Sequence, residues 1–437
     1  MLDDPLRAQS VSLVVGCVLA VVAVVGGLVL AAVRPGSDLG DAPILISSKS
    51  GALYAQLDGV VHPVLNLASA RLVARSAATP EPVSDAALAA ARRGPLIGIP
   101  GAPHRIDPPL TGAESGWTLC DTAKSGETVL HIGRAPGALL PFAAGAARLV
   151  VPRDAGPAAT YLLFDGIRAA VDLRDIAVVR ALRLEGIVPQ PVARSLLDSV
   201  PEVPAVAAPV VTGPGGPGPA ALGGAVVGTV LRLVRSDVAE FYVVLPGGLQ
   251  RISRVAADLV RFTVPQASAA PPDVTADTVA RIPIVADLDV GPLPETVASA
   301  TTSVLCVGWD PSHLDPVART TLYEGNSLEP AAVELAQRDG ADPKLDGITI
   351  APGRSVLARS SGLLDVEGAT PGTLYLIDDR GVRYGLQDID TATHLGLTRP
   401  AVAGPWPMLA MLPRGPELSR EAASIVRDGL DTRGPAS

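Results

Sequence analysis

The chain is poor in the residue types that bind nucleic acids and metal ions. Aromatic residues make up 3% of its 437 residues, too few for stacking on bases to be a main binding device. Its 35 basic residues are outnumbered by 44 acidic ones, and the formal net charge of −9 argues against a protein that binds a phosphate backbone through a basic face. None of the three cysteines is spaced from another as in a zinc site. The composition therefore predicts no nucleic-acid partner and no metal site.

The sequence also lacks the short motifs that mark common enzyme classes. A P-loop requires a glycine immediately before its lysine, and the three lysines, Lys49, Lys124 and Lys344, follow serine, alanine and proline. The five histidines are dispersed, and neither the nucleophile elbow of hydrolases nor a Ser-x-x-Lys motif occurs. We therefore expect no catalytic residue and no cofactor.

One long apolar run is present near the N-terminus. Residues 11–33 form a stretch of 23 residues without a charge. As a helix that rises about 1.5 Å per residue, such a stretch crosses a bilayer core of about 30 Å. A cleaved signal peptide is the alternative, but it begins with a basic region, whereas the segment here carries two acids and one arginine. The sequence predicts a short cytosolic N-terminus over residues 1–10 and a single-pass transmembrane helix over residues 11–33.

Small residues recur within this run at helical spacing. Gly16, Ala20, Ala23 and Gly27 fall on one face of the predicted helix. Small side chains let two helices approach closely in lipid, so this face is a candidate for helix packing in the membrane. The alternative is that glycine and alanine are simply abundant in this chain.

The cysteines bear on the orientation in the membrane. Arg7 and Arg34 lie on opposite sides of the apolar run, so positive charge does not decide which end is cytosolic. Cys120 and Cys306 lie in the remaining body, and one such pair suits a disulfide in an oxidising compartment. Two unrelated thiols in a cytosolic body are the alternative. We expect the disulfide, and hence an extracytoplasmic body anchored in the plasma membrane.

A short pattern recurs four times along the body. Each copy has a tyrosine in an apolar run and a glycine five or six residues later. The pairs are Tyr54 and Gly59, Tyr161 and Gly166, Tyr242 and Gly248, and Tyr375 and Gly381. A glycine between two strand-like runs predicts a β-hairpin, because glycine accepts the positive φ of the turn. A strand-like run before each tyrosine and a helix-compatible stretch after each hairpin extend the unit to β-β-β-α.

Two other stretches resemble each other. Trp117–Cys120 and Cys306–Trp309 both read as strands with a cysteine and a tryptophan within three residues. If they pair in one central sheet, the cysteines become disulfide partners. The predicted fold is α+β and β-rich, with a central β domain and four small modules. Its parts are the modules 43–96, 148–187, 226–265 and 348–397, the central segments 97–147 and 281–347, a Pro/Gly-rich linker over 201–224, and a C-terminal tail over 398–437.

Several strings together resemble one known family. They are Asp4-Pro5-Leu6, the stretch from Leu53 to Leu72, the stretch from Gly98 to Pro103, the stretch from Trp117 to Thr122, the stretch from Tyr242 to Gly248, and the stretch from Gly381 to Gly385. The resemblance is to EccB, the membrane-anchored component of the actinobacterial type VII (ESX) secretion system, and it covers nearly the whole chain.

The resemblance implies a cytosolic N-terminus, one membrane helix and a large extracytoplasmic body. In that body it implies a disulfide at the positions matched by Cys120 and Cys306, and four modules similar to a cell-wall-binding fold of phage lysins. The implied partners are EccC, EccD, EccE and the mycosin protease. We therefore expect a structural subunit that organises the extracytoplasmic side of a secretion channel. The alternatives are an extracytoplasmic ATP hydrolase, a role attributed to the family, and an anchor that binds peptidoglycan.

Overall fold

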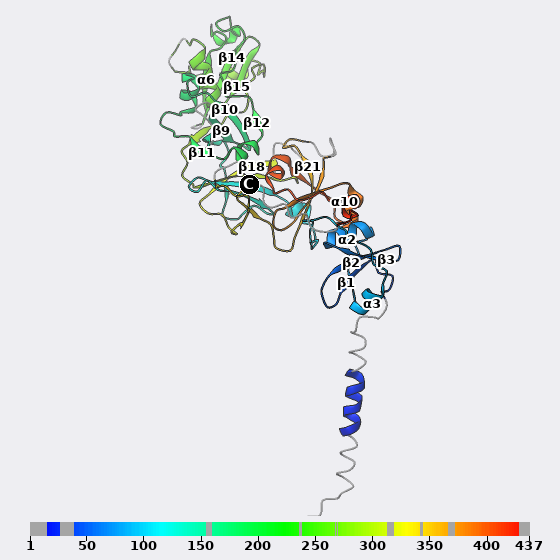
Figure 1. Cartoon of the computed structure of the whole chain (residues 1–437). Coiled ribbons are helices and arrows are strands. Elements are labelled where there is room, and N and C mark those ends of the chain that lie inside the picture. The colour runs from blue at the N-terminus through cyan, green and yellow to red at the C-terminus, as the bar shows by residue number, and fades with distance from the viewer. Residues whose placement is uncertain are drawn as a thin grey trace, which may run out of the picture. The chain divides into compact units, whose positions relative to one another are not determined.

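The computed structural model describes residues 15–26, 39–153, 160–235, 238–266, 268, 270–312, 319–340, 344–365 and 372–427 (Figure 1). The fold is α+β and is built mainly from short strands. The described residues form two compact units. One holds the described residues up to Ile106, Leu386–Thr398 and those from Pro416 onward, and the other holds those of Asp107–Gly385 and Arg399–Gly415.

The first sheet lies in the first unit and has the strand order β3-β2-β1-β4. Its strands are β1 (Ile44–Ser47), β2 (Leu53–Leu57), β3 (Val60–Val64) and β4 (Glu81–Val83). The first three are antiparallel, whereas β4 returns parallel to β1. Helix α2 (Leu67–Ala74) joins β3 to β4, and α3 (Asp85–Ala90) follows β4. After α3, Arg93 and Ile97 form parallel bridges to β3.

The second sheet follows the same plan in the other unit, with the order β11-β8-β9-β10-β12. Its strands are β8 (Ala146–Pro152), β9 (Thr160–Phe164), β10 (Ile167–Val171), β11 (Gln190–Val192) and β12 (Glu202–Val203). Helices α4 (Ile176–Leu182) and α5 (Arg194–Asp198) flank β11. β11 is parallel to β8, and β12 is parallel to β10. β16 (Thr296–Ala298) also pairs with β8.

The third sheet has three strands in the order β13-β14-β15. They are β13 (Val230–Arg235), β14 (Val238–Leu245) and β15 (Gly248–Ile252). Helix α6 (Arg254–Thr263) follows β15, and α7 (Ala276–Ala280) comes later. Single parallel bridges replace the outer strands here. Asp273 pairs with Arg232 on β13, and Ile284 pairs with Leu249 on β15.

The fourth sheet has the order β23-β22-β21-β24. Its strands are β21 (Val356–Ser361), β22 (Leu374–Ile377), β23 (Arg383–Leu386) and β24 (Val402–Pro405). β24 is parallel to β21. Helix α8 (Ile389–His394) precedes β24, and α9 (Trp406–Met411) follows it. Arg414 forms a parallel bridge to Arg383 on β23.

The central sheet has seven strands in the order β19-β20-β6-β5-β17-β18-β7. They are β5 (Trp117–Thr122), β6 (Thr128–Ile132), β7 (Leu140–Pro141), β17 (Val304–Trp309), β18 (Thr320–Gly325), β19 (Val333–Glu334) and β20 (Gly347–Thr349). Two short 3-10 helices, Gly112–Glu114 and Ala220–Leu222, complete the elements of this unit. All six residues of β17 are buried, as continuous apolar strands in the middle of a sheet are.

Helices follow the third strand of each small sheet because a polar residue caps them there. Asn66, Ser253 and Asp388 each accept a hydrogen bond from the backbone N–H three residues ahead, at the start of α2, α6 and α8. Asp175 does the same for α4 and also accepts from the N–H two residues ahead. Such caps satisfy N–H groups that the first helical turn leaves without partners.

In each small sheet a segment after the first helix pairs in parallel with the first strand, and we call it the returning strand. Each returning strand contains or adjoins a proline. Pro82 and Pro191 lie within β4 and β11, Pro405 ends β24, and Pro272 precedes the bridge at Asp273. Proline cannot donate a ladder hydrogen bond, so it suits an edge strand and hinders the addition of a further strand there. Part of the proline content of the chain is therefore explained by these four edges.

The units are longer than the predicted β-β-β-α. After each first helix the chain adds a segment parallel to the first strand, then a second short helix, and then a segment parallel to the third strand. The predicted modules 148–187, 226–265 and 348–397 therefore end before these later elements. The sequence pattern missed them because they are only two to four residues long or single bridges.

Two expectations about irregular segments are wrong. The stretch 201–224 is not an unpacked linker, since it contains β12 and its Val206 and Val211 are buried in two hydrophobic clusters. Likewise the predicted tail 398–437 contains β24, α9 and α10 (Arg420–Ala423) within its described part. In the first unit, Val426, beyond α10, forms an antiparallel bridge with Ile97, which itself bridges β3.

Candidate functional site

The predicted disulfide is present in the central sheet. Cys120 on β5 lies directly opposite Cys306 on β17 in an antiparallel pair, and their Cα atoms are 4.0 Å apart. The bond joins positions separated by 186 residues. Leu139 and Val304 are buried beside it, and Tyr323 packs against the same cluster. The two distant central segments thus become one covalently closed sheet.

The two tryptophans also meet across these strands. Trp117 lies opposite Trp309, and both are buried. The indole N–H of Trp309 donates to the carbonyl oxygen of Leu363, 3.1 Å away. The hydrophobic core around them takes in residues of the second and fourth sheets, among them Val150 and Ile377. The central sheet therefore shares one core with two of the small sheets.

A buried ionic contact fixes the second sheet to the central one. Asp121, next to Cys120, is 1% exposed, and both of its carboxylate oxygens accept from the Nη2 atom of Arg153, at 2.7 and 2.9 Å. It also accepts from the backbone N–H of Ala193 at 2.8 Å, just before α5. The sequence analysis missed this contact, although Asp121 stands in the same string as Trp117 and Cys120. No pattern in the sequence pairs it with Arg153.

The four tyrosines lie on the second strand of each small sheet. Tyr54 lies opposite Leu45, Tyr161 opposite Val150, Tyr242 opposite Leu231, and Tyr375 opposite Ala358. In the first, second and fourth sheets the opposite residue also begins the pairing with the returning strand. The tyrosine therefore has the same register position in these three sheets, whereas in the third sheet the bridge to Asp273 starts at Arg232, opposite Phe241.

Arginine stacks on two of these tyrosines. The guanidinium of Arg168 lies 5.6 Å from the ring centre of Tyr161. Arg383 lies 5.6 Å from the ring of Tyr375 and 5.4 Å from that of Trp406. These contacts hold the third strand against the second and, in the fourth sheet, against α9. They explain why tyrosine and arginine face each other without invoking a ligand.

Three of the four predicted turn glycines take positive φ, and one does not. Gly59, Gly166 and Gly381 have φ of 76°, 77° and 84°. Gly248 is instead the first residue of β15, opposite Leu245, so Gly247 occupies the turn. A Cβ at Gly248 would collide with the carbonyl oxygen of Pro283, since the strand segment at Ile284 passes close by. Glycine is therefore required at position 248 because the Pro283 backbone lies close to it, and not because of the turn.

The acidic pair Asp378-Asp379 lies in the turn after β22. Asp378 is nearly buried and accepts from the backbone N–H groups of Arg380 and Val382 and from the Arg380 guanidinium. Burial, together with the Asp378 carboxylate, raises the pKa of the nearby Tyr384 to about 12. Tyr384 therefore stays protonated at neutral pH. Asp378 therefore organises the turn, and Asp379 accepts from the backbone N–H of Gly353 at 3.0 Å.

The apolar run is described over residues 15–26, which are helical. Gly16, Ala20 and Ala23 lie in this helix and are exposed, while Gly27 and residues 1–10 fall outside the described residues. Within the described part, no helix combines the length and apolar character needed to cross a bilayer. Among the same residues, no cluster of three or more His, Cys, Asp or Glu side chains could hold a metal ion.

Comparison with known proteins identifies the family. The family model for "Type VII secretion system ESX-1, transport TM domain B", or EccB, matches residues 1–432. The chain is 34% identical to the ESX-3 secretion system ATPase EccB3 of Mycobacterium tuberculosis (strain H37Rv), over 98% of this chain and 85% of the relative. It is also 34% identical to the ESX-2 secretion system ATPase EccB2 of the same strain, over 99% and 90%. The chain belongs to the EccB family.

Solved structures agree with this assignment. A chain of an intact ESX-5 inner membrane complex aligns with a TM-score of 0.76 and 26% identity, over 100% of this chain and 92% of that one. A chain of the EccB3 dimer from the ESX-3 core complex aligns with a TM-score of 0.74 and 32% identity, over 88% and 100%. The architecture described above is thus shared with components of these complexes.

Proposed function

We propose that this chain is a structural subunit of a type VII secretion membrane complex and organises its extracytoplasmic side. The observation that carries the proposal is the full-length similarity to a chain of the intact ESX-5 inner membrane complex. The build of the body supports it. A disulfide closes the central sheet, and this sheet shares its core with two small sheets, so the central part of the chain is one continuous packed support.

The four small sheets are, in this proposal, copies of one unit that serve as docking modules. Their shared strand order and tyrosine register support a common origin. Pairwise superposition of the sheets on the residues opposite each tyrosine is the direct test. Copies of one unit would align their returning strands and both helices, whereas unrelated sheets would align the hairpins alone.

The apolar run 11–33 is proposed to anchor the body as a single-pass helix with a cytosolic N-terminus. Its proposed partners are EccC, EccD, EccE and the mycosin protease, as the family resemblance implies. Helix packing through Ala23 and Gly27 would bring the chain into the complex, because lipid provides little hydrophobic force between helices.

Blue-native electrophoresis of detergent-extracted membranes tests this proposal. The wild-type chain is expected in a high-mass band, whereas Ala23→Leu/Gly27→Leu is expected to insert normally and migrate outside that band. Val18→Leu/Val25→Leu, on the opposite face of the helix, is the matched control. Assembly of both double variants would show that the small-residue face is not a packing surface. Absence of the wild-type chain from any complex would refute the structural role.

ATP hydrolysis is the second candidate because the relatives' names describe ATPases. The two proposals differ in one measurement. If the role is structural, the purified full-length chain will hydrolyse Mg-ATP no faster than a mock purification. Turnover that copurifies with the chain and is abolished by a single substitution would favour the enzyme. Sedimentation with purified cell wall in the absence of other subunits would favour the peptidoglycan anchor.

A further inference from the structure

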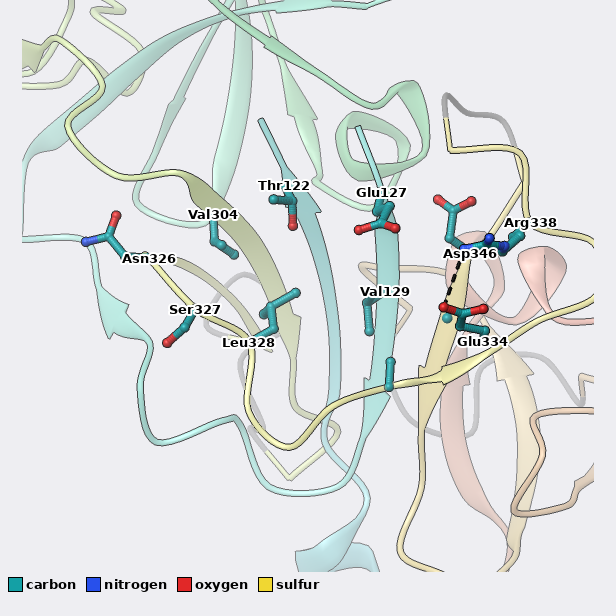
Figure 2. A pocket seen from close by; sticks show the side chains of 12 residues that line it. Thr122, Glu127, Val129, Val304, Asn326, Ser327, Leu328, Glu334, Arg338 and Asp346 are labelled. Atoms are coloured by element: carbon teal, nitrogen blue, oxygen red, sulfur yellow. Dashed lines mark ion pairs between the residues drawn. The ribbon is translucent and has the colours of Figure 1, made fainter. Parts of the chain in front are cut away.

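A cavity lies on one face of the central sheet, beside the disulfide cluster (Figure 2). Its volume is about 360 Å³, near the lower end of the range of roughly 300–1,000 Å³ found for small-ligand sites. Apolar side chains line one part of it, namely Val129, Val304, Leu328 and Ala332. Leu328 also packs against the cluster that contains the disulfide, so the floor of the cavity rests on the most constrained part of the sheet.

The charged residues of the cavity are mostly acidic. Glu127, Glu334 and Asp346 line it together with one cation, Arg338. Arg338 is already engaged, since its Nη1 atom lies 3.5 Å from a carboxylate oxygen of Glu334. Glu127 is exposed and forms no ion pair within the part of the chain that the structure describes. With three carboxylates and one guanidinium, the lining carries a net charge of about −2, which disfavours an anion such as a nucleotide.

Asp346 is held in place by the backbone. One of its oxygens accepts from the N–H of Thr128 at 2.8 Å, and the other accepts from the N–H groups of Asp339 and Gly340 at 3.0 and 2.7 Å. The side chain is 5% exposed, so its negative charge is fixed at the wall of the cavity. Asp346 therefore adds a fixed negative charge to the cavity wall. Glu127 forms no ion pair among the described residues, and Glu334 shares its charge with Arg338 across an exposed contact of 3.5 Å.

The gaps in the described body of the chain contain no lysine or arginine that could fill this cavity. Between residues 39 and 427, the undescribed positions contain neither residue type. The acidic rim and the apolar lining together suit a basic side chain that another molecule presents. The cavity also adjoins β19, the outermost strand of the central sheet, so a passing protein segment has access to it.

We propose that this cavity receives one lysine or arginine side chain from a partner protein. The aliphatic stem of such a side chain would lie on Val129, Val304 and Leu328, and its charged head would reach Glu127 and Glu334. Long basic side chains combine these two properties, burying their methylene groups while keeping the head among polar groups. A bare metal ion would gain nothing from the apolar floor. The inference depends on the fold of the central domain and not on which complex the chain joins.

N-acetyl-arginine amide is the probe that tests this proposal, and N-acetyl-citrulline amide, which has the same shape without the charge, is its matched control. Methyl NMR of the full-length chain in detergent would follow Val129, Val304 and Leu328. We expect saturable shifts at these methyl groups with the arginine probe, and binding at least fivefold weaker with citrulline. Equal responses to both probes, or no shift at the three residues, would overturn the proposal.

Two variants check that the cavity itself is the site. Glu127→Gln/Glu334→Gln should weaken binding of the arginine probe at least fivefold, whereas Glu81→Gln/Glu185→Gln, exposed acids elsewhere, should not change it. Ala332→Leu should block the cavity and abolish the shifts while leaving the remaining spectrum intact. Mg-ATP should produce no shift at these residues. Binding of Mg-ATP there, or full retention of arginine binding in the Gln double variant, would show that the assignment is wrong.

Discussion

The central sheet and the first small sheet are stabilised by different interactions. In the central sheet, β5 and β17 pair over six residues, both are buried almost throughout, and a disulfide crosses between them. In the first sheet, strands of three to five residues are held by a capped helix and by segments added at both edges. The central sheet therefore depends on burial and on a covalent cross-link. The first sheet depends on local hydrogen bonds at the ends of its helix and strands.

Removing the disulfide should lower stability more than any other change considered below, and only in the central sheet. Cys120→Ala/Cys306→Ala is expected to destabilise the central sheet by about 4 kcal/mol, since the bond closes a long loop in the unfolded chain. Hydrogen exchange of the full chain would show faster exchange in β5 and β17 and unchanged exchange in β1 and β2. Cys17→Ala is the control. Equal acceleration in both sheets would mean that the two parts unfold together.

The disulfide and the hairpins could be predicted from the sequence because they have local signals. Cys120 and Cys306 each stand beside a tryptophan, and Asp-Gly at residues 58–59 and 165–166 lies between two apolar runs. The strand-like run expected before each tyrosine is present as β1, β8, β13 and β21. These features are determined by residues close together in the chain, so they can be predicted from the sequence.

The returning strands and the acidic cavity could not be predicted, because they depend on distant partners. Thr128 and Asp346 are 218 residues apart, and their hydrogen bond follows only once β6 and β20 pair. Asp273 likewise pairs with Arg232 through a single bridge, too short for a hydrophobic period to show. The stretch 201–224 looked like a linker because its prolines and glycines hide the valines that it buries.

The buried Asp121 should be the second most sensitive position. Asp121→Asn would remove the charge that the Arg153 guanidinium faces and leave that guanidinium without its anion, at a cost of about 3 kcal/mol. Urea unfolding monitored by tryptophan fluorescence measures the loss, since Trp117 is on the same strand. Asp198→Asn, which removes an exposed partner of Arg168, is the control and should cost under about 1 kcal/mol. Similar costs for the two would contradict the role of burial.

In the first sheet, removing the N-cap of α2 should cause the next largest loss of stability. Asn66→Ala removes an N-cap that accepts from the Ser69 N–H at 2.9 Å and donates to the Ile99 carbonyl oxygen at 2.8 Å. The expected loss is about 2 kcal/mol, at the upper end for caps because Asn66 is buried. Hydrogen exchange in α2 measures it. Asn66→Asp should recover the cap but not the bond to Ile99, and a variant as stable as wild type would show that the latter bond contributes little.

Breaking the ion pair at the single-bridge edge of the third sheet should destabilise the chain less than any of the three changes above. Asp273→Asn weakens an exposed ion pair in which the two oxygens of Asp273 accept from Nε and Nη2 of Arg232, at 2.7 and 3.1 Å. Exposed pairs contribute under about 1 kcal/mol, and raising the salt concentration should remove most of the difference. Thermal unfolding at low and high salt provides the comparison. A loss above about 2 kcal/mol would mean that this bridge holds the edge as firmly as a full strand does.

The smallest effect concerns acid stability at the start of the central domain. The Glu114 carboxylate accepts from the Thr111 backbone N–H and hydroxyl and from Arg354, and these bonds lower its pKa from 4.5 to about 2. A carboxylate whose pKa is lower in the folded chain than in the unfolded chain stabilises the fold at pH values above its unfolded-state pKa. That stabilisation is lost as the pH falls through its folded-state pKa. Glu114→Gln should therefore lose stability relative to wild type above about pH 4.5, and the difference should shrink between pH 4.5 and 2. Acid unfolding curves of both chains test this, and a difference that stays constant across the window would mean that the capping bonds do not depend on the charge.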